Sequence, residues 1–171
     1  MLAVILLSLG IASRLIIHIP DFTPIISVAL LSGAYIKSRY GAVLLPLVLM
    51  AITDIFLGFH ETMLFTWGSM VLITCLGFWL QNRKNIKTVL GTSVCAAVVF
   101  FVITNFGVWL VSGMYPHTMP GLRDCFVLAI PYFRAELAST LIYSTGLFLA
   151  YELIANRLRK TRLAPIFLST K

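Results

Sequence analysis

Long apolar runs alternate with short polar breaks along nearly the whole chain. Proline or charged residues mark most breaks, and Thr23 followed by Pro24 has the residue types of a helix N-cap and first helical position. Runs of about 20 apolar residues are long enough to cross the hydrocarbon of a bilayer as α-helices. The second run is short for a span, so we expect it to tilt little or to lie in locally thin bilayer. The pattern predicts six membrane-spanning helices, over approximately 2–18, 24–36, 41–57, 62–80, 88–111 and 132–156.

The segment between the fifth and sixth predicted spans has a different character. Pro116 and Pro120 indicate a loop, and residues 121–130 then allow one or two helical turns, which are too short to cross. We expect this piece to be an interfacial or re-entrant helix on the outer face. The predicted fold class is therefore all-α: a single domain over 1–171, an integral membrane bundle of about six transmembrane helices with a short interfacial helix between helices 5 and 6.

Composition supports the membrane assignment and narrows the function. The chain is 60% hydrophobic and only 11% charged, whereas a soluble domain carries about 25% charged residues. Six spans would use nearly all of the 171 residues, so we expect no soluble catalytic domain, no enzyme activity and no cofactor. The first apolar run lacks a basic N-terminal region and continues into Arg14, so we interpret it as a retained span rather than a signal peptide.

The positions of the cationic residues predict an orientation. Ten of the thirteen Lys and Arg residues lie in the breaks after spans two and four or in the basic tail 157–171. In a six-span chain these three places share one side, and the positive-inside rule makes that side cytoplasmic. We therefore expect a multi-pass protein of the cytoplasmic (inner) membrane with both termini inside. The basic tail is interpreted as a stop-transfer run that also attracts anionic lipid, not as a nucleic-acid site.

Most other ionisable groups are predicted to lie near the opposite, outer surface. A charge at depth in a bilayer costs about 2.5–3.5 kcal/mol on insertion scales unless it is paired or faces water. Several such groups at related depths therefore predict mutual ion pairs, a wet cavity, or both. The candidate ligand-binding residues are Arg14, His18, Asp54, His60, Asn105, His117, Arg134 and Glu136.

A structural role or a metal site for the same residues stays open. Ion pairs such as Arg14 with Glu136 and Arg134 with Asp54 would fix helix register without any ligand. Imidazole and carboxylate groups also suit zinc and similar ions. However, the chain has no H-E-x-x-H motif, and Cys75, Cys95 and Cys125 have no metal-ligand spacing. The sequence therefore leaves a metal site undetermined.

Several short segments carry a family resemblance. They are Arg14–Ile25, Gly33–Tyr35, Pro46, Thr53–His60, Thr104–Trp109 and Met114–Pro116. With these segments the chain resembles an uncharacterised bacterial six-span membrane-protein family. That family is similar in size and layout to the S components, the substrate-binding subunits of energy-coupling-factor (ECF) transporters.

The resemblance implies a subunit that binds a vitamin or metal and passes it across with an ATP-driven energy-coupling module. S components commonly dock through an A-x-x-x-A surface in their first helix, and here Ser8 to Ala12 has the related small-x-x-x-small spacing, with Ser in place of one Ala. This departure leaves solitary transport as an alternative. We therefore expect a transport subunit that captures a small polar or metal-bearing solute from the non-cytoplasmic face. The alternatives are a structural or assembly subunit of a membrane complex and, ranked third, an intramembrane metal-dependent enzyme.

Overall fold

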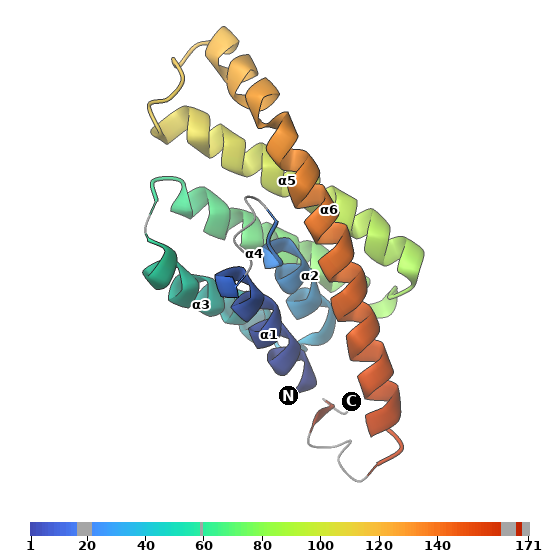
Figure 1. Ribbon diagram of the computed structural model, residues 1–171. Helices are drawn as coiled ribbons and strands as arrows, with labels where there is room; N and C mark the ends of the chain where they lie inside the picture. Colours follow the sequence, from blue (N-terminus) through green and yellow to red (C-terminus); the bar gives the residue numbers. More distant parts are fainter. Residues whose placement is uncertain (17–21, 59, 162–166, 169–171) are drawn as a thin grey trace.

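The protein is an all-helical bundle in the computed structural model, which describes residues 1–16, 22–58, 60–161 and 167–168 (Figure 1). Within these residues, six α-helices and one 3-10 turn follow one another. They are α1 (Leu2–Ile16), α2 (Ile25–Tyr35), α3 (Arg39–Leu57), α4 (Met63–Trp79), η1 (Leu80–Asn82), α5 (Ile86–Val111) and α6 (Met119–Leu158).

Side-chain hydroxyl and amide groups define several helix starts. Ser38 accepts a hydrogen bond from the backbone N–H of Gly41, Asn85 from that of Thr88, and Thr118 from that of Gly121. Each bond satisfies one of the backbone donors that a helix leaves unpaired in its first turn. These caps place α3 and α5 within a few residues of their predicted starts, whereas α6 begins near the predicted outer helix and well before the predicted last span.

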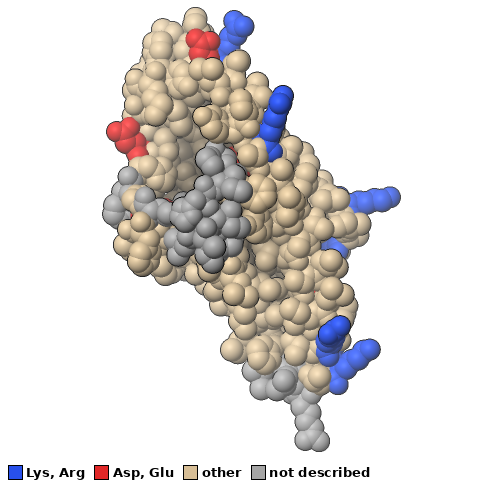
Figure 2. Space-filling view, in the orientation of Figure 1, with Lys and Arg blue, Asp and Glu red and all other residues tan. Residues whose placement is uncertain are grey.

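Helices α3 to α6 have the length and composition of membrane spans. Within the described residues, these four helices are long and apolar enough to cross a membrane. Large apolar side chains such as Leu44, Ile55, Leu64 and Leu72 are exposed along them, and the face in Figure 2 is mostly free of charge. A surface of this kind suits a lipid environment. The finding is consistent with the predicted membrane protein. Four helices of the described residues meet the length criterion, and the predicted count of six spans is not confirmed.

Helix α2 is a short helix enclosed by protein. Its 11 residues extend about 16 Å, roughly half the thickness of a hydrocarbon core. All residues from Ile25 to Ala34 are buried, and α2 contacts each of the other five helices. A helix in this position needs neither the length nor the surface of a lipid-facing span, because its surroundings are other helices.

The predicted boundary between a short outer helix and the last span is wrong. Helix α6 runs without a break over 40 residues, through both the predicted outer helix 121–130 and the predicted last span 132–156, with Pro131 inside it. A proline is tolerated inside an apolar helix when neighbouring groups or small local adjustments satisfy the freed carbonyl. At about 60 Å, α6 is twice as long as the hydrocarbon is thick, and it extends beyond the rest of the bundle in Figure 1.

The two chain ends lie at the same end of the bundle (Figure 1). The N-terminal ammonium of Met1 donates to the backbone oxygen of Phe167 at 3.2 Å. The same end holds the last turn of α2, since Tyr35 bonds Glu152 near the end of α6. We call it the terminal end and the other the loop end, which carries the α3–α4 and α5–α6 connections.

Helices α2 and α4 approach each other closely where Gly33 of α2 meets Gly77 of α4. A Cβ atom built on Gly33 would lie 2.2 Å from the backbone oxygen of Thr74 and 2.8 Å from the Cα of Gly77. A Cβ on Gly77 would lie 2.6 Å from the backbone oxygen of Leu30. Only glycine at both positions allows the two backbones to approach this far, as is common at helix interfaces in membranes.

Candidate functional site

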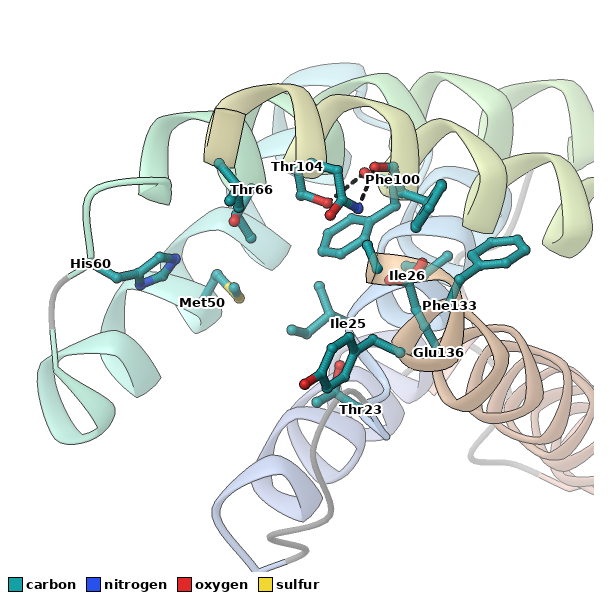
Figure 3. Close-up of a pocket in the computed structure, with 15 residues that line it drawn as sticks. Thr23, Ile25, Ile26, Met50, His60, Thr66, Phe100, Thr104, Phe133 and Glu136 are labelled. Atoms are coloured by element: carbon teal, nitrogen blue, oxygen red, sulfur yellow. Dashed lines mark hydrogen bonds between the residues drawn. The ribbon is translucent and has the colours of Figure 1, made fainter. Parts of the chain in front are cut away.

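A cavity of about 400 Å³ lies at the loop end, between α2, α3, α4, α5 and α6. Figure 3 shows the labelled side chains from these elements converging on one space, and the molecular surface is hollowed in this region in Figure 2. The residues that line it are Thr23, Ile25, Ile26, Met50, His60, Thr66, Phe100, Phe101, Thr104, Asn105, Val108, Ala129, Tyr132, Phe133 and Glu136.

Helix α5 supplies one wall through residues one turn apart. Phe100 and Phe101 are followed four positions later by Thr104 and Asn105, so these two pairs lie on neighbouring stripes of the helix. The Thr104 hydroxyl donates to the Phe100 carbonyl at 2.8 Å, and the Asn105 Nδ2 donates to the Phe101 carbonyl at 2.8 Å. Because the Asn105 NH₂ group is held by the preceding turn, its amide oxygen is the acceptor that it can offer to a solute.

Helix α6 supplies an aromatic and acidic wall. Tyr132, Phe133 and Glu136 line the cavity from successive turns, and the Phe133 ring lies 4.7 Å from that of Phe101, centroid to centroid. The turn that carries Glu136 is joined to the start of α2, because the Ser139 hydroxyl donates to the backbone oxygens of Glu136 and Thr23. The carboxyl group therefore enters the cavity wall from a firmly held part of the helix.

Three of the eight predicted ligand-binding residues come together here. His60 from the α3–α4 connection, Asn105 from α5 and Glu136 from α6 all line the same cavity. They reach it from three separate parts of the chain, so the sequence-based idea of a shared polar site has a structural counterpart. Whether these side chains bind a ligand stays a prediction.

Asp54 lies behind the cavity wall. It is fully buried and follows Met50, a lining residue, by one turn of α3. Its Oδ2 accepts a hydrogen bond from the Trp67 indole nitrogen at 3.0 Å, which joins α3 to α4. The geometry gives Asp54 a part in positioning these two helices, with the partly buried Trp67 as its hydrogen-bond partner.

Of the other four predicted residues, the two whose side chains the structure describes, Arg134 and His117, do not line the cavity. Arg134 is exposed on α6. His117 is exposed in the α5–α6 connection, where its ring lies 5.4 Å from that of Trp109. Arg14 belongs to the last turn of α1, but its side chain lies outside the described structure, and so does His18.

Metal-ligating side chains do not gather among the described residues. No group of three or more His, Cys, Asp and Glu side chains that could hold an ion occurs there. The cavity thus offers isolated polar groups on aromatic and aliphatic walls, and this composition is typical of small-molecule sites.

Sequence reasoning missed most of the cavity wall. Thr23, Phe100, Phe101, Tyr132 and Phe133 were not among the candidates because an apolar or hydroxyl side chain in a span is expected without any function. For Phe101, Tyr132 and Phe133, a spacing of three or four positions from Asn105 or Glu136 is the signal that could have found them.

A seam of hydroxyl groups lies between α2 and α6, on the side of the cavity towards the terminal end. The Ser27 hydroxyl donates to the backbone oxygen of Thr140 at 3.0 Å, and the Ser144 hydroxyl donates to Ser27 Oγ at 2.9 Å. All three residues are fully buried. Three hydrogen-bonded pairs connect the α2 region to α6 at nearly the same sequence separation. Thr23 and Ser139 are 116 positions apart, while Ser27 and Ser144, and likewise Tyr35 and Glu152, are 117 positions apart. Helices α2 and α6 therefore run parallel in nearly constant register.

The match with a family model covers almost the whole chain, from residue 1 to residue 163, and its description is "Family of unknown function (DUF6580)". The chain belongs to the DUF6580 family. Comparison of this DUF6580 protein with curated proteins and with solved structures found no match. The similarity to S components that the sequence predicts therefore has no support from these comparisons.

Proposed function

We propose that this DUF6580 protein is a membrane-embedded subunit that binds a small polar or metal-bearing solute from the non-cytoplasmic face and passes it inward. The observation that carries the proposal is the cavity at the loop end, in which His60, Asn105 and Glu136 share walls with aromatic rings. Its volume of about 400 Å³ falls in the range of small-molecule pockets. Polar side chains inside a membrane protein are costly next to lipid, and a bound solute or water in this cavity would offset part of that cost.

The charge distribution supports the direction of uptake. Both termini lie at the end opposite the cavity, together with the cationic residues that follow α2, precede α5 and end α6. Under the positive-inside rule that end faces the cytoplasm. The cavity would then face outward in the cytoplasmic membrane, where it can receive a solute.

The hydroxyl seam supports a transport role over passive storage. Ser27, Thr140 and Ser144 lie between the cavity and the terminal end, and inside the bundle they join α2 to α6 through hydrogen bonds of ordinary length. Such contacts can be exchanged for water or solute when two helices separate, at lower cost than breaking a packed apolar core. We infer that α2 and α6 part along this seam during transfer.

An S-component-like partnership is part of the proposal. Ser8 and Ala12 are both exposed on α1, so the small-residue spacing lies on the surface of the bundle, where another helix could approach closely. An ATP-driven module is the partner that this surface would suit, with solitary transport as the alternative.

A specific observation also favours the second candidate, an assembly subunit. The loop end carries exposed large apolar side chains at Met114, Met119 and Leu128 on the projecting part of the α5–α6 hairpin. A partner protein could cover them. An enzyme has no comparable support in the described geometry.

Small molecules and metals that copurify with the protein in mild detergent provide the test. We expect mass spectrometry to find one retained solute, and replacing Glu136 with Gln together with Asn105 with Ala to reduce its binding about 10- to 100-fold, since hydrogen bonds to charged groups contribute about 1.5–3 kcal/mol. Glu61→Gln is the matched control, because Glu61 is exposed and outside the cavity wall.

The outcomes separate the candidate functions. Equal solute retention by the double variant and the control would remove the cavity from the proposal. Copurification of a defined protein partner without a solute would favour the assembly role, and turnover of the retained solute would favour an enzyme.

A further inference from the structure

Two adjoining cavities lie at the terminal end, far from the proposed solute site. Their volumes are about 300 Å³ and about 190 Å³, and they share Tyr35, Lys84 and Glu152. Glu152 follows Glu136 by four turns and more of α6, about 24 Å along the helix. The two cavities are therefore a separate feature of the molecule.

The larger cavity has a surplus of positive charge. Lys37, Lys84 and Arg159 line it, and Glu152 is the one acidic residue among the described residues of its wall. The Tyr35 hydroxyl donates to Glu152 Oε1 at 2.6 Å, so a neutral donor already solvates this carboxylate. The remaining cations can then attract a further anion.

Tyr35 arranges the charged groups around its ring. The Lys84 ammonium lies over the ring at 4.3 Å from the centroid, while the hydroxyl on the same ring holds Glu152. Tyr151 stacks on Tyr35 with a centroid separation of 3.6 Å. Aromatic and cationic groups are thus fixed at one level of the bundle, where an approaching anion meets a preformed surface.

The smaller cavity is apolar and continues the larger one towards the surface. Ile86 and Val89 from α5 and Phe148 and Leu149 from α6 line it. Ile86 is 56% and Leu149 55% exposed, so this groove reaches the face that lipid would cover. A polar, cationic hollow therefore adjoins an apolar groove.

We propose that this pair of cavities binds an anionic phospholipid, with the phosphate headgroup among Lys84, Arg159 and Lys37 and an acyl chain along the groove of Ile86 and Leu149. Cationic hollows between helices at the cytoplasmic surface suit anionic headgroups. The apolar groove distinguishes a lipid from a free phosphate ion, because only the lipid gains from covering it.

The protonation of Lys84 agrees with an anionic ligand. Desolvation lowers the pKa of Lys84, Arg159 lowers it further, and Glu152 acts in the opposite direction. A phosphate oxygen beside the ammonium would stabilise its charged form and offset this loss.

Lipid binding to the full-length protein in an uncharged detergent tests the proposal. Native mass spectrometry would count phosphatidylglycerol and phosphatidylcholine adducts, and thermal unfolding would be followed with each lipid, with glycerol phosphate and with inorganic phosphate. We expect phosphatidylglycerol alone to remain bound and to raise the unfolding temperature.

The charge variants localise the effect. Lys84→Gln combined with Arg159→Gln should weaken phosphatidylglycerol binding about 10-fold or more. Arg157→Gln combined with Lys160→Gln is the matched control, because it removes the same charge at the same end from exposed residues outside both cavities. If the double variant fails to fold, Arg159→Gln alone, at the exposed end of α6, is compared with the same control for phosphatidylglycerol binding.

Three results would overturn the proposal. One is equal binding of both lipids, another is an equal loss of phosphatidylglycerol binding in the control, and the third is stabilisation by inorganic phosphate as large as that by the lipid. Each outcome leaves the solute site at the loop end untouched, since none of its residues is altered.

Discussion

Replacing Gly33 with alanine should loosen the crossing that sets the distance between α2 and α4. The added Cβ would lie 2.2 Å from the backbone oxygen of Thr74 and 2.8 Å from the Cα of Gly77, whereas ordinary contacts begin near 3.4 Å. Both obstacles are backbone atoms, so no side-chain rotation relieves them. The helices must separate by about 1 Å to restore normal contact.

Two structural losses determine the size of the effect. Overpacking a buried site costs about 1–3 kcal/mol. The Gln81 side chain donates to the Gly33 carbonyl at 3.0 Å, and its loss adds about 0.5–1.5 kcal/mol. For a chain of this size 1 kcal/mol corresponds to about 2–4 °C. We therefore expect the midpoint of thermal unfolding in detergent to fall by roughly 3–18 °C.

Alanine at Gly68 and Gly91 provides the control. Nothing lies within 4 Å of a Cβ built at either position, and alanine favours a helix by about 1 kcal/mol over glycine. These variants should unfold at the same temperature as the unaltered protein or slightly above it. A midpoint for Gly33→Ala that matches the controls would refute the close α2–α4 crossing.

Three further predictions concern Asp54, the hydroxyl seam and Lys84. Asp54→Leu should lower the free energy of unfolding by about 1–3 kcal/mol, because Trp67 loses its buried acceptor. Asp54→Asn keeps an acceptor and should retain most of the stability. An equal loss of stability in both variants would contradict this role. The hydroxyl oxygens of Ser27 and Ser144 lie 2.9 Å apart, so cysteines at these two positions should form a disulfide. The disulfide should leave solute binding intact but stop uptake until it is reduced. Undiminished uptake by the oxidised protein would exclude separation of α2 and α6 at the seam. Since the folded pKa of Lys84 lies below its ordinary value of 10.5, its charged form destabilises the fold, and stability should rise with pH between the lowered pKa and 10.5. Lys84→Gln should abolish that rise in pH-dependent denaturant titrations, and an unchanged slope would argue against the desolvated position.

The membrane character and most helix positions follow from the sequence because apolar periodicity and length report directly on lipid exposure. The same rule fails for α2, whose short run reflects burial among other helices rather than thin bilayer. It also fails between 130 and 132, where the sequence predicts a boundary and helix α6 continues through Pro131. Local propensity cannot show which neighbouring groups will satisfy the carbonyl that proline leaves free.

The candidate site was predictable only in its charged and amide members. His60, Asn105 and Glu136 stood out because such groups are costly in lipid. Arg134 stood out for the same reason, yet it is exposed, because depth along a helix does not specify the direction around it. Glu152 was the one acidic residue outside the predicted outer group, and its bond to Tyr35 depends on a parallel α2–α6 register that arises only in the folded bundle.

The enclosed position of α2 has a consequence for biogenesis. The hydrogen-bond partners of the Ser27 side chain belong to α6, more than a hundred residues later in the chain. Helix α2 therefore reaches the membrane well before these partners are synthesised. A nascent chain that ends before α6 would hold α2 with unsatisfied polar groups, which cost free energy in hydrocarbon. Quality-control proteases should therefore degrade carboxy-terminal truncations far faster than the complete chain, and maturation becomes a late event at the ribosome.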